Sequence, residues 1–327
     1  METFTIIMGL LAGLVLFLHG VTLLSESLKR VAGERMKKVL ERFTTNRFAG
    51  VLTGTVATTL LDSSSVTIIM VIALVNAGLL SFTRSLGVIM GSNIGTTISS
   101  QIIAFHINEY APIALLVGFG LHMLAKSKKW KRIGQLAFGM GLIFFGLDVM
   151  GKAVEPLQAQ PLFLAWMTRM EAPLLGALVG AAFTVMVQSS SATLGIVITL
   201  ATQELITLPA GIAIMLGAEI GTCADTLMAT VGRSREAVRA GVFHLLFNLI
   251  TVSIGVALAH PFTALVQYIS SGTDVSRQIA NAHLLFNVAG VVLFIGFVSP
   301  VVKLLEWLIP DKARSIQADR AVEPGVV

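Results

Sequence analysis

Two serine triplets, at residues 63–65 and 189–191, are the parts of this chain whose type and position best suit binding chemistry. They interrupt two apolar segments, 48–80 and 173–206, whose separate arms are shorter than the roughly 20 residues that cross a bilayer as a helix. A helix broken at membrane depth exposes unpaired N–H and C=O groups, which are tolerated only where they line a cavity or bind a ligand. We therefore predict two re-entrant helical hairpins, each with a binding site at its break.

The chemistry of such a break serves two kinds of ion. The returning arm begins with free N–H groups and a partial positive charge, which suit an anion. The carbonyl groups that end the entering arm, together with the side-chain oxygens of Asp62 or Gln188, suit a hard cation such as sodium. The alternative is that the serines only allow close helix contact. Two triplets at equivalent positions argue against it.

The chain contains an internal duplication. A shift of 126 residues carries Ser63 onto Ser189, Thr58 onto Thr184 and Gly91 onto Gly217, without a gap. A duplicated helical pattern of this kind predicts two copies of one structural unit.

A second paired motif lies beyond each hairpin, at residues 91–97 (GSNIGTT) and 217–223 (GAEIGTC). Its glycines share one helix face, and close helix packing accounts for them. Packing does not account for Asn93 and Glu219, or for the threonines that follow, so we treat these polar residues as candidates for binding. Asp225, one helical turn after Thr222, is a further candidate.

The composition is that of an integral membrane protein. Of the 327 residues, 55% are hydrophobic and 13% are charged, whereas soluble domains carry about 25% charged residues. The net charge of +5 does not indicate nucleic-acid binding, because the basic residues form short loops without interleaved aromatic residues. The single cysteine, Cys223, excludes an internal disulfide. No Lys or Arg precedes the first apolar run, which argues against a cleaved signal peptide.

The apolar runs predict an all-α fold. Besides the hairpins, membrane spans are expected at about 5–28, 83–105, 110–125, 133–151, 209–230, 240–258 and 281–308. Each repeat then holds three spans and one hairpin, and an odd number of spans gives the repeats opposite orientations. The predicted organisation is repeat one at 1–126, repeat two at 127–258, an outer loop with an extra, unpartnered helix at 259–310, and a cytoplasmic tail at 311–327. Inverted repeats with broken helices are typical of secondary transporters.

The basic segments predict the orientation. They lie at 29–47, 126–132 and 233–239 and in the tail, and all of them reach the cytoplasm only if the N-terminus is outside and the C-terminus inside. The segment 29–47 has apolar residues at helical spacing, which predicts a helix in the cytoplasmic interface. Its repeat partner, with Leu162, Trp166 and Met170, would lie at the outer face. The simpler interpretation, an amphipathic linker without function, is preferred for both.

These paired motifs resemble those of the type II sodium–phosphate cotransporter family, and bacterial members are the most similar. The resemblance implies a sodium-coupled phosphate symporter of the bacterial inner membrane that is not an enzyme, needs only sodium as coupling ion, and leaves a homodimer open. It implies substrate binding at both hairpin breaks, by Ser63, Ser64, Ser65, Gln188, Ser189, Ser190, Ser191, Thr96 and Thr222. Cation binding is expected at Asp62, Thr67, Asn93, Gln188, Thr193, Glu219 and Asp225.

Two positions depart from the family pattern. Asp62 stands where the family has a glutamine, and Glu219 stands where it has an asparagine. A carboxylate at the bilayer centre costs roughly 2.5–3.5 kcal/mol on insertion scales, so we expect these acids to bind a cation or a proton. The repeats pair them with Gln188 and Asn93, and all four residues are predicted to converge near the midplane. Sequence drift in a water-filled cavity is the alternative.

Other functions remain open at this point. The acids are compatible with cation- or proton-coupled transport of another small anion, and a membrane sensor or scaffold could bind a ligand without moving it. The stretch 146–153 (GLDVMGKA) lacks the Ser/Thr of a P-loop, which argues against an ATP-driven pump. An intramembrane hydrolase is disfavoured because no histidine lies near the serine triplets in the sequence.

Overall fold

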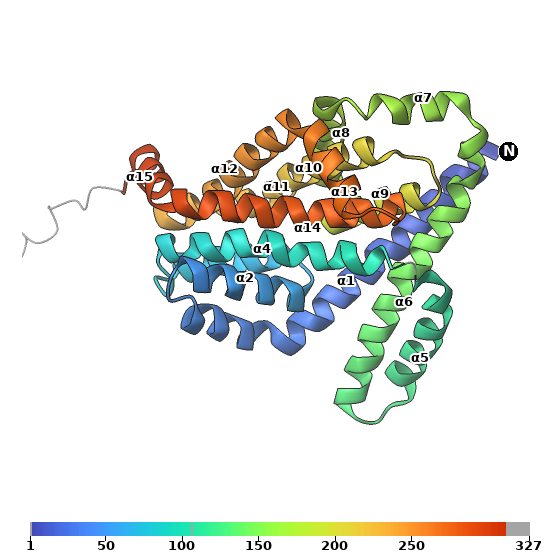
Figure 1. The fold of residues 1–327 in the computed structure, drawn as a ribbon. Coiled ribbons are helices and arrows are strands. Elements are labelled where there is room, and N and C mark those ends of the chain that lie inside the picture. Colours follow the sequence, from blue (N-terminus) through green and yellow to red (C-terminus); the bar gives the residue numbers. More distant parts are fainter. Residues whose placement is uncertain (1, 106, 312–327) are drawn as a thin grey trace, which may run out of the picture.

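A computed structural model describes residues 2–105 and 107–311, and within these ranges all regular secondary structure is helical. The predicted all-α class is confirmed. Nearly all of the predicted cytoplasmic tail, from residue 312 onward, lies outside the described residues. The helices pack side by side, with the N-terminus and helix α15 (Val298–Leu308) at opposite ends of the molecule (Figure 1).

The described helices include five that are long and apolar enough to cross a membrane, or six if the bent pair α7 (Pro161–Arg169) and α8 (Pro173–Val187) is one span. The chain is therefore a multi-pass membrane protein. The five segments are Phe4–Arg30, Lys128–Ala159, Leu208–Met228, Arg235–Ala257 and Val275–Leu308.

Two predicted spans are not among these five. Helix α5 (Ala111–Leu124) has 14 residues, fewer than the roughly 20 that cross the hydrocarbon core. Helix α4 (Phe82–Ile103) is long enough at 22 residues, but it carries Arg84 and a series of serine, threonine and asparagine residues that it buries against other helices. The polar face of α4 is therefore surrounded by other helices of the protein, where an apolar span would be surrounded by lipid.

The first helix differs from its prediction. Helix α1 runs without interruption through Glu2–Phe43, so the basic segment 29–47 is not a separate interfacial helix. The equivalent part of repeat two is divided into α6 (Lys128–Val154), the 3₁₀ turn η2 (Glu155–Ala159) and α7. Pro156 and Pro161 explain the difference, because proline ends or kinks a helix and residues 2–43 contain none.

Both predicted helix breaks are present, and they have the same local structure. Helices α2 (Arg47–Leu61) and α3 (Ser64–Asn76) are separated by Asp62 and Ser63. Helices α8 and α9 (Ser190–Thr202) are separated by Gln188 and Ser189. A shift of 126 residues carries the bounds of the first pair onto those of the second, so the duplication seen in sequence is a duplication of structure.

The broken helices fold back as hairpins. A Cβ atom on Gly87 would lie 2.3 Å from the carbonyl oxygen of Arg47, and one on Gly91 would lie 2.0 Å from that of Val51. Contacts that advance together along both chains show that α2 and α4 run parallel. Because α4 follows α3 after a short turn and begins beside the start of α2, α3 must run back along α2. In repeat two, Gly217 lies as close to Ala177 of α8, with the Cβ position 1.9 Å from the carbonyl oxygen.

Equivalent helices of the two repeats also cross one another. A Cβ atom on Gly13 of α1 would lie 2.7 Å from the carbonyl oxygen of Gly146 of α6, and one on Gly20 would lie 2.8 Å from that of Gly139. The pairing advances along α1 as it recedes along α6, so the two helices are antiparallel. Their small residues let the backbones approach closely.

The remaining helical elements are one turn in repeat one, the helices that complete repeat two, and those that follow it. They are the turn η1 (Ile107–Tyr110), α10 (Leu208–Gly221), α11 (Cys223–Met228), α12 (Arg235–Ala257), α13 (Ala259–Ile269), α14 (Val275–Phe294) and the turn η3 (Ile295–Phe297), which leads into α15. Helices α14 and α4 lie side by side through the middle of the molecule (Figure 1). This contact carries part of the polar chemistry described below.

Candidate functional site

Both serine triplets line one cavity of about 350 Å³. Its wall is completed by the two residues that precede the triplets, by one residue that follows α10, and by one face of α1. The lining residues include Asp62, Ser63, Ser64, Ser65, Gln188, Ser189, Ser190, Ser191 and Thr222, with Thr22, Ser25, Glu26 and Lys29 from α1. The two hairpin breaks, far apart in the sequence, thus meet at one place.

The serines hold the start of each returning arm. The Ser63 hydroxyl accepts from the backbone N–H of Val66 at 3.2 Å, and the Ser189 hydroxyl accepts from that of Ala192 at 3.1 Å. Both are N-caps, the position that serine favours because it satisfies an otherwise unpaired helix N–H. The first turns of two helices, each 13 residues long, therefore face the same cavity with their partial positive charges. Such an arrangement can hold an anion.

The residues before the triplets turn the chain. Asp62 and Gln188 have φ of 52° and 57°, in the left-handed region, and each ends the entering helix of its hairpin. The last carbonyl groups of a helix are left without intrahelical partners and carry a partial negative charge. The Ser99 hydroxyl donates to the Asp62 carboxylate. Asp62 and Gln188 therefore bring acceptor groups to the cavity that holds the anion-binding helix starts.

Threonine pairs fasten the two arms of each hairpin behind the break. The hydroxyls of Thr58 and Thr67 lie 2.9 Å apart, and those of Thr184 and Thr193 lie 2.7 Å apart. Thr67 and Thr193, which we expected to bind cations, are fully buried and do not line the cavity. Their hydroxyls also donate to the carbonyl oxygens of Ser63 and Ser189, so they position the breaks.

The face of α1 that lines the cavity, here called the α1 wall, was not predicted from the sequence. Thr22, Ser25, Glu26 and Lys29 lie at helical spacing on one face of α1, and they line the cavity. Lys29 is the one basic side chain on that wall, within the part of the chain that the structure describes. Glu26 pairs with Arg30 at 2.9 Å, with 56% of the Glu26 side chain exposed. The signal was present as a polar face that continues the apolar run, but Glu26 was included in the predicted span 5–28 and Lys29 was assigned to the basic segment 29–47.

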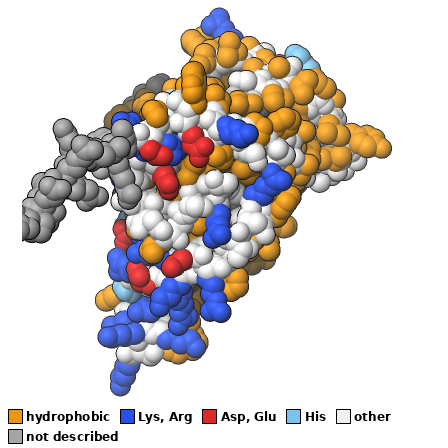
Figure 2. All heavy atoms as spheres, turned by 90° about the vertical axis from the view of Figure 1, so that its left-hand side faces the viewer, with side chains coloured by type: hydrophobic (Ala, Val, Ile, Leu, Met, Phe, Trp, Pro, Cys, Tyr) orange, Lys and Arg blue, Asp and Glu red, His pale blue; other side chains and the backbone are white. Residues whose placement is uncertain are grey.

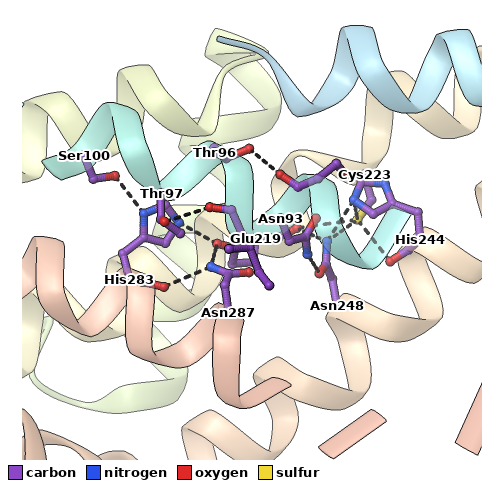
Figure 3. A network of polar contacts seen from close by, with 12 residues as sticks. Asn93, Thr96, Thr97, Ser100, Glu219, Cys223, His244, Asn248, His283 and Asn287 are labelled. Atoms are coloured by element: carbon purple, nitrogen blue, oxygen red, sulfur yellow. Dashed lines mark hydrogen bonds and ion pairs between the residues drawn. The ribbon is translucent and has the colours of Figure 1, made fainter. Parts of the chain in front are cut away.

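Glu219 lies in a separate buried network rather than on the cavity wall (Figure 3). His283 Nε2 lies 2.8 Å from Glu219 Oε1, and Asn287 donates to the same oxygen at 2.9 Å. Ser100 Oγ lies 2.7 Å from His283 Nδ1. Two side chains of α14 thus hold the carboxylate of α10 and a serine of α4.

An equivalent network surrounds Asn93 (Figure 3). Asn93 donates to Asn248 Oδ1 at 2.6 Å, and Thr226 Oγ1 lies 2.8 Å from His244 Nδ1. Asn248 also donates to the carbonyl oxygen of Glu219 at 2.9 Å, which joins the two networks.

The two networks are related by the duplication. A shift of 126 residues carries Asn93 onto Glu219 and Ser100 onto Thr226, so α12 and α14 each contact one equivalent residue from each repeat. The contacts come from two His-Leu-Leu-Phe-Asn runs, at 244–248 and 283–287. Helices α12 and α14 thus make the same kinds of contact, each to one residue of either repeat.

Of the other residues predicted to bind substrate or cations, some line the cavity and others do not. Thr222 lines the cavity, whereas Thr96 is buried and donates to the carbonyl oxygen of Ser92 within its own helix. Asp225 lies beside Ser65 of the first triplet, and its carboxylate accepts from the backbone N–H of Thr226 at 2.7 Å. Of the four residues expected to converge, Asp62 and Gln188 share the cavity, and Asn93 and Glu219 share the buried networks.

The fold and site together define a multi-pass helical membrane protein with two broken hairpins around one polar cavity. The chain belongs to the Na⁺/Pi-cotransporter family, whose sequence pattern matches residues 16–152 and 157–304.

Several curated proteins are similar to this chain. "Uncharacterized protein YqeW" of Bacillus subtilis (strain 168) is 31% identical over 94% of this chain and 99% of its own length. "Putative inorganic phosphate export protein YjbB" of Escherichia coli (strain K12) is 24% identical over 94% of this chain, and the match covers 56% of the length of that protein. Human "Sodium-dependent phosphate transport protein 2B" is 33% identical over 37% of this chain and 19% of its own length. No solved structure matches the chain.

Proposed function

We propose that this protein is a sodium-coupled transporter of inorganic phosphate. The anion and its coupling ions would bind in the cavity that both serine triplets line, which we call the serine cavity. The observation that carries the proposal is the convergence of two helix N-termini on one cavity that also holds acceptor groups. Family membership and the names of two relatives support phosphate as the anion and sodium as the cation.

The charges of the cavity favour ordered binding. Its wall carries the acids Glu26 and Asp62 and the base Lys29, so a divalent phosphate meets acids as well as helix N-termini. Moving two negative charges into an inside-negative cell costs about 4.6 kcal/mol per 100 mV, twice the single-charge value. Two sodium ions would cancel the charge of the phosphate, and a third would make uptake electrogenic. We infer that cations bind before or with the anion.

The residues divide into proposed roles. The serine triplets, Gln188 and Thr222 would contact phosphate, because they line the cavity beside the helix starts. Asp62, with the carbonyl groups that end α2, would hold a sodium ion, and Asp225 would act through Ser65. Glu219 and Asn93 would act at a distance, by fixing α10 and α4.

The same geometry supports an inverted-repeat architecture in the membrane. The equivalent helices α1 and α6 are antiparallel, and each hairpin returns to the end from which it began. Lys and Arg side chains gather on the face that holds α15 (Figure 2). By the positive-inside rule this face would be cytoplasmic, with the N-terminus outside, in a bacterial inner membrane.

Uptake of radiolabelled phosphate into proteoliposomes tests this proposal. We expect accumulation with an inward sodium gradient and none with potassium in its place, and competition by sulfate measures the choice of anion. Ser190→Leu should abolish uptake, because the added side chain fills the space beside the helix start. Ser253→Leu is the matched control, since Ser253 is exposed on α12. Sodium-independent uptake in the wild type, or normal uptake by Ser190→Leu, would refute the proposal.

The direction of transport is a separate measurement. One relative is named for phosphate export and another for sodium-dependent transport. Because coupling sets direction through the ion gradients, reversal of the sodium gradient across loaded vesicles should reverse the net phosphate flux. A flux that ignores this reversal would favour ligand binding without coupled transport.

A further inference from the structure

A second, smaller polar cavity of about 150 Å³, which we call the α6 cavity, lies where α6 meets the end of α9. Four of its lining residues belong to α6: Leu147, Asp148, Gly151 and Lys152. The others include Thr199 and Gln203 of the α9 end, and Ile103 of α4. Nothing in the proposed binding site uses these groups.

The α6 wall is the repeat counterpart of the α1 wall. A shift of 126 residues carries Val21, Thr22, Ser25 and Glu26, all of which line the serine cavity, onto Leu147, Asp148, Gly151 and Lys152. Each of the two helices also carries an ion pair at a spacing of four residues, Glu26–Arg30 at 2.9 Å and Asp148–Lys152 at 2.7 Å, although Arg30 itself does not line the serine cavity. The same helix face therefore lines a cavity in both repeats.

These two cavities lie toward opposite ends of the molecule. A Cβ atom on Gly9, near the start of α1, would lie 2.7 Å from the Cβ of Ala153, next to Lys152. The α6 wall is therefore beside the N-terminal end of α1, whereas the serine cavity extends along α1 to Lys29. Figure 1 shows the end of α6 beside the N-terminus and the rest of α1 running away from it.

A third cavity, of about 200 Å³, lies between these two and is mostly apolar. It shares Asp62 and Ser191 with the serine cavity and Ile103 with the α6 cavity. Phe17 lines it and is completely buried. A Cβ atom on Gly195 of α9 would lie 2.9 Å from Phe17 Cζ and 3.5 Å from Ile103 Cδ1. Phe17 and Ile103 thus form an apolar plug against Gly195, and hydrated ions do not cross such a constriction while it stays closed.

We propose that the α6 cavity is the outer half of the transport route, separated from the serine cavity in this structure, and that Phe17 and Ile103 form the gate between the two cavities. The inference rests on the proposed function. In the structure the serine cavity is reached along α1. When the repeats exchange conformations, as inverted repeats do, the α6 face takes the place of the α1 face beside the serines. Asp148 and Lys152 then line the mouth through which the anion passes on the N-terminal side.

Cysteine labelling tests the route without relying on phosphate. Thr22→Cys and Asp148→Cys are placed singly in Cys223→Ser protein, in vesicles of known orientation, and exposed to a membrane-impermeant thiol reagent. We expect labelling of Thr22→Cys from the side of the basic loops and of Asp148→Cys from the opposite side. Labelling of both from one side would overturn the inference.

A second measurement tests the gate itself. Ser25→Cys should react slowly, if at all, from the Asp148 side, and adding Phe17→Ala should raise that rate at least tenfold. Phe243→Ala is the control, because Phe243 is equally buried but lies in the other hydrophobic core. If Phe17→Ala does not insert, Ile103→Ala takes its place. An unchanged rate in a folded gate variant, or an equal rise in Phe243→Ala, would reject the gate.

The outcomes separate this inference from the proposed function. If the two positions are labelled from opposite sides but phosphate is not taken up, the proposed route is supported and must serve another solute. If sodium drives phosphate uptake but both positions are labelled from one side, the proposed function is supported and the proposed route is contradicted.

Discussion

Asp62 and Gln188 have nearly the same left-handed backbone, with φ of 52° and 57°, and line the same cavity from hairpins 126 residues apart in sequence. They differ in charge. One break therefore brings a carboxylate to the cavity and the other an amide of neutral charge, in matched surroundings. The two breaks are otherwise alike, so this difference in charge is the feature that can make one break favour the coupling cation and the other favour the anion.

Replacement of that carboxylate should change cation coupling. We expect Asp62→Asn to shift the sodium dependence of phosphate uptake by tenfold or more, and to change the apparent phosphate affinity less than threefold. Asparagine tolerates the left-handed conformation, so the backbone should be kept. The measurement is uptake against sodium concentration at fixed phosphate. Glu41→Gln is a control far from the cavity, and a wild-type sodium curve for Asp62→Asn would remove the acid from the coupling site.

Lys29 should draw the anion to the cavity. Lys29→Gln removes the basic side chain of the cavity wall, and we expect it to raise the KM for phosphate three- to tenfold, more strongly at low ionic strength because salt screens exposed charges. Lys29→Arg should restore most of the affinity. Lys37→Gln, further along α1 and outside the cavity lining, serves as the comparison. An equal effect of Lys37→Gln would show that only the overall charge of the face matters.

Glu219 should act through structure rather than by touching the anion. Glu219→Leu removes the carboxylate oxygen that both His283 Nε2 and Asn287 contact, and lost buried hydrogen bonds cost about 1–3 kcal/mol each. We expect Glu219→Leu to lower the Tm in detergent by several degrees, and Glu219→Gln, which keeps an acceptor oxygen, to lower it less. If phosphate raises the Tm of Glu219→Gln as it does that of the wild type, the cavity is intact. Equal Tm values for the two variants would contradict the hydrogen-bond account.

The glycines at the contact between α2 and α4 should not tolerate replacement by a residue with a side chain. A Cβ on Gly91 would lie 2.0 Å from a carbonyl oxygen, so Gly91→Ala must push the helices apart, at a cost of typically 1–3 kcal/mol. Gly120 on α5 has open space around its Cβ position, and Gly120→Ala should instead stabilise by roughly 0.5–1 kcal/mol, because alanine favours the helix. Thermal unfolding in detergent compares the two. A neutral Gly91→Ala would mean that the two helices separate easily.

The orientation can be tested at one exposed position in each repeat. Met36 is buried, so a cysteine there would report poorly, whereas Lys38 and Leu162 are exposed. In Cys223→Ser protein, Lys38→Cys should react only from the cytoplasmic side and Leu162→Cys only from outside. Reaction of both from one side would end the inverted-repeat arrangement.

The sequence predicted the features that are local or repeated. The breaks at the serine triplets and the close glycine contacts follow from residue types at short spacing, so both were found. The sites of Asn93 and Glu219 could not be predicted in the same way. A repeat shows that two residues are equivalent, but equivalent residues lie on opposite sides of the symmetry relation and need not touch. Their partners Asn248 and His283 come from helices distant in sequence, and only the packing of α12 and α14 brings them together.

The contact between α2 and α4 also limits how the protein can change shape. Glycines spaced by four residues, Gly87, Gly91 and Gly95, each face a carbonyl oxygen of α2. Sliding by one turn, about 5.4 Å, would bring Thr83 or Ser99 against those oxygens at a distance that no side chain tolerates. Each hairpin and the helix that follows it are therefore locked in register, as a stiff block. Any large rearrangement has to occur between such blocks rather than within them.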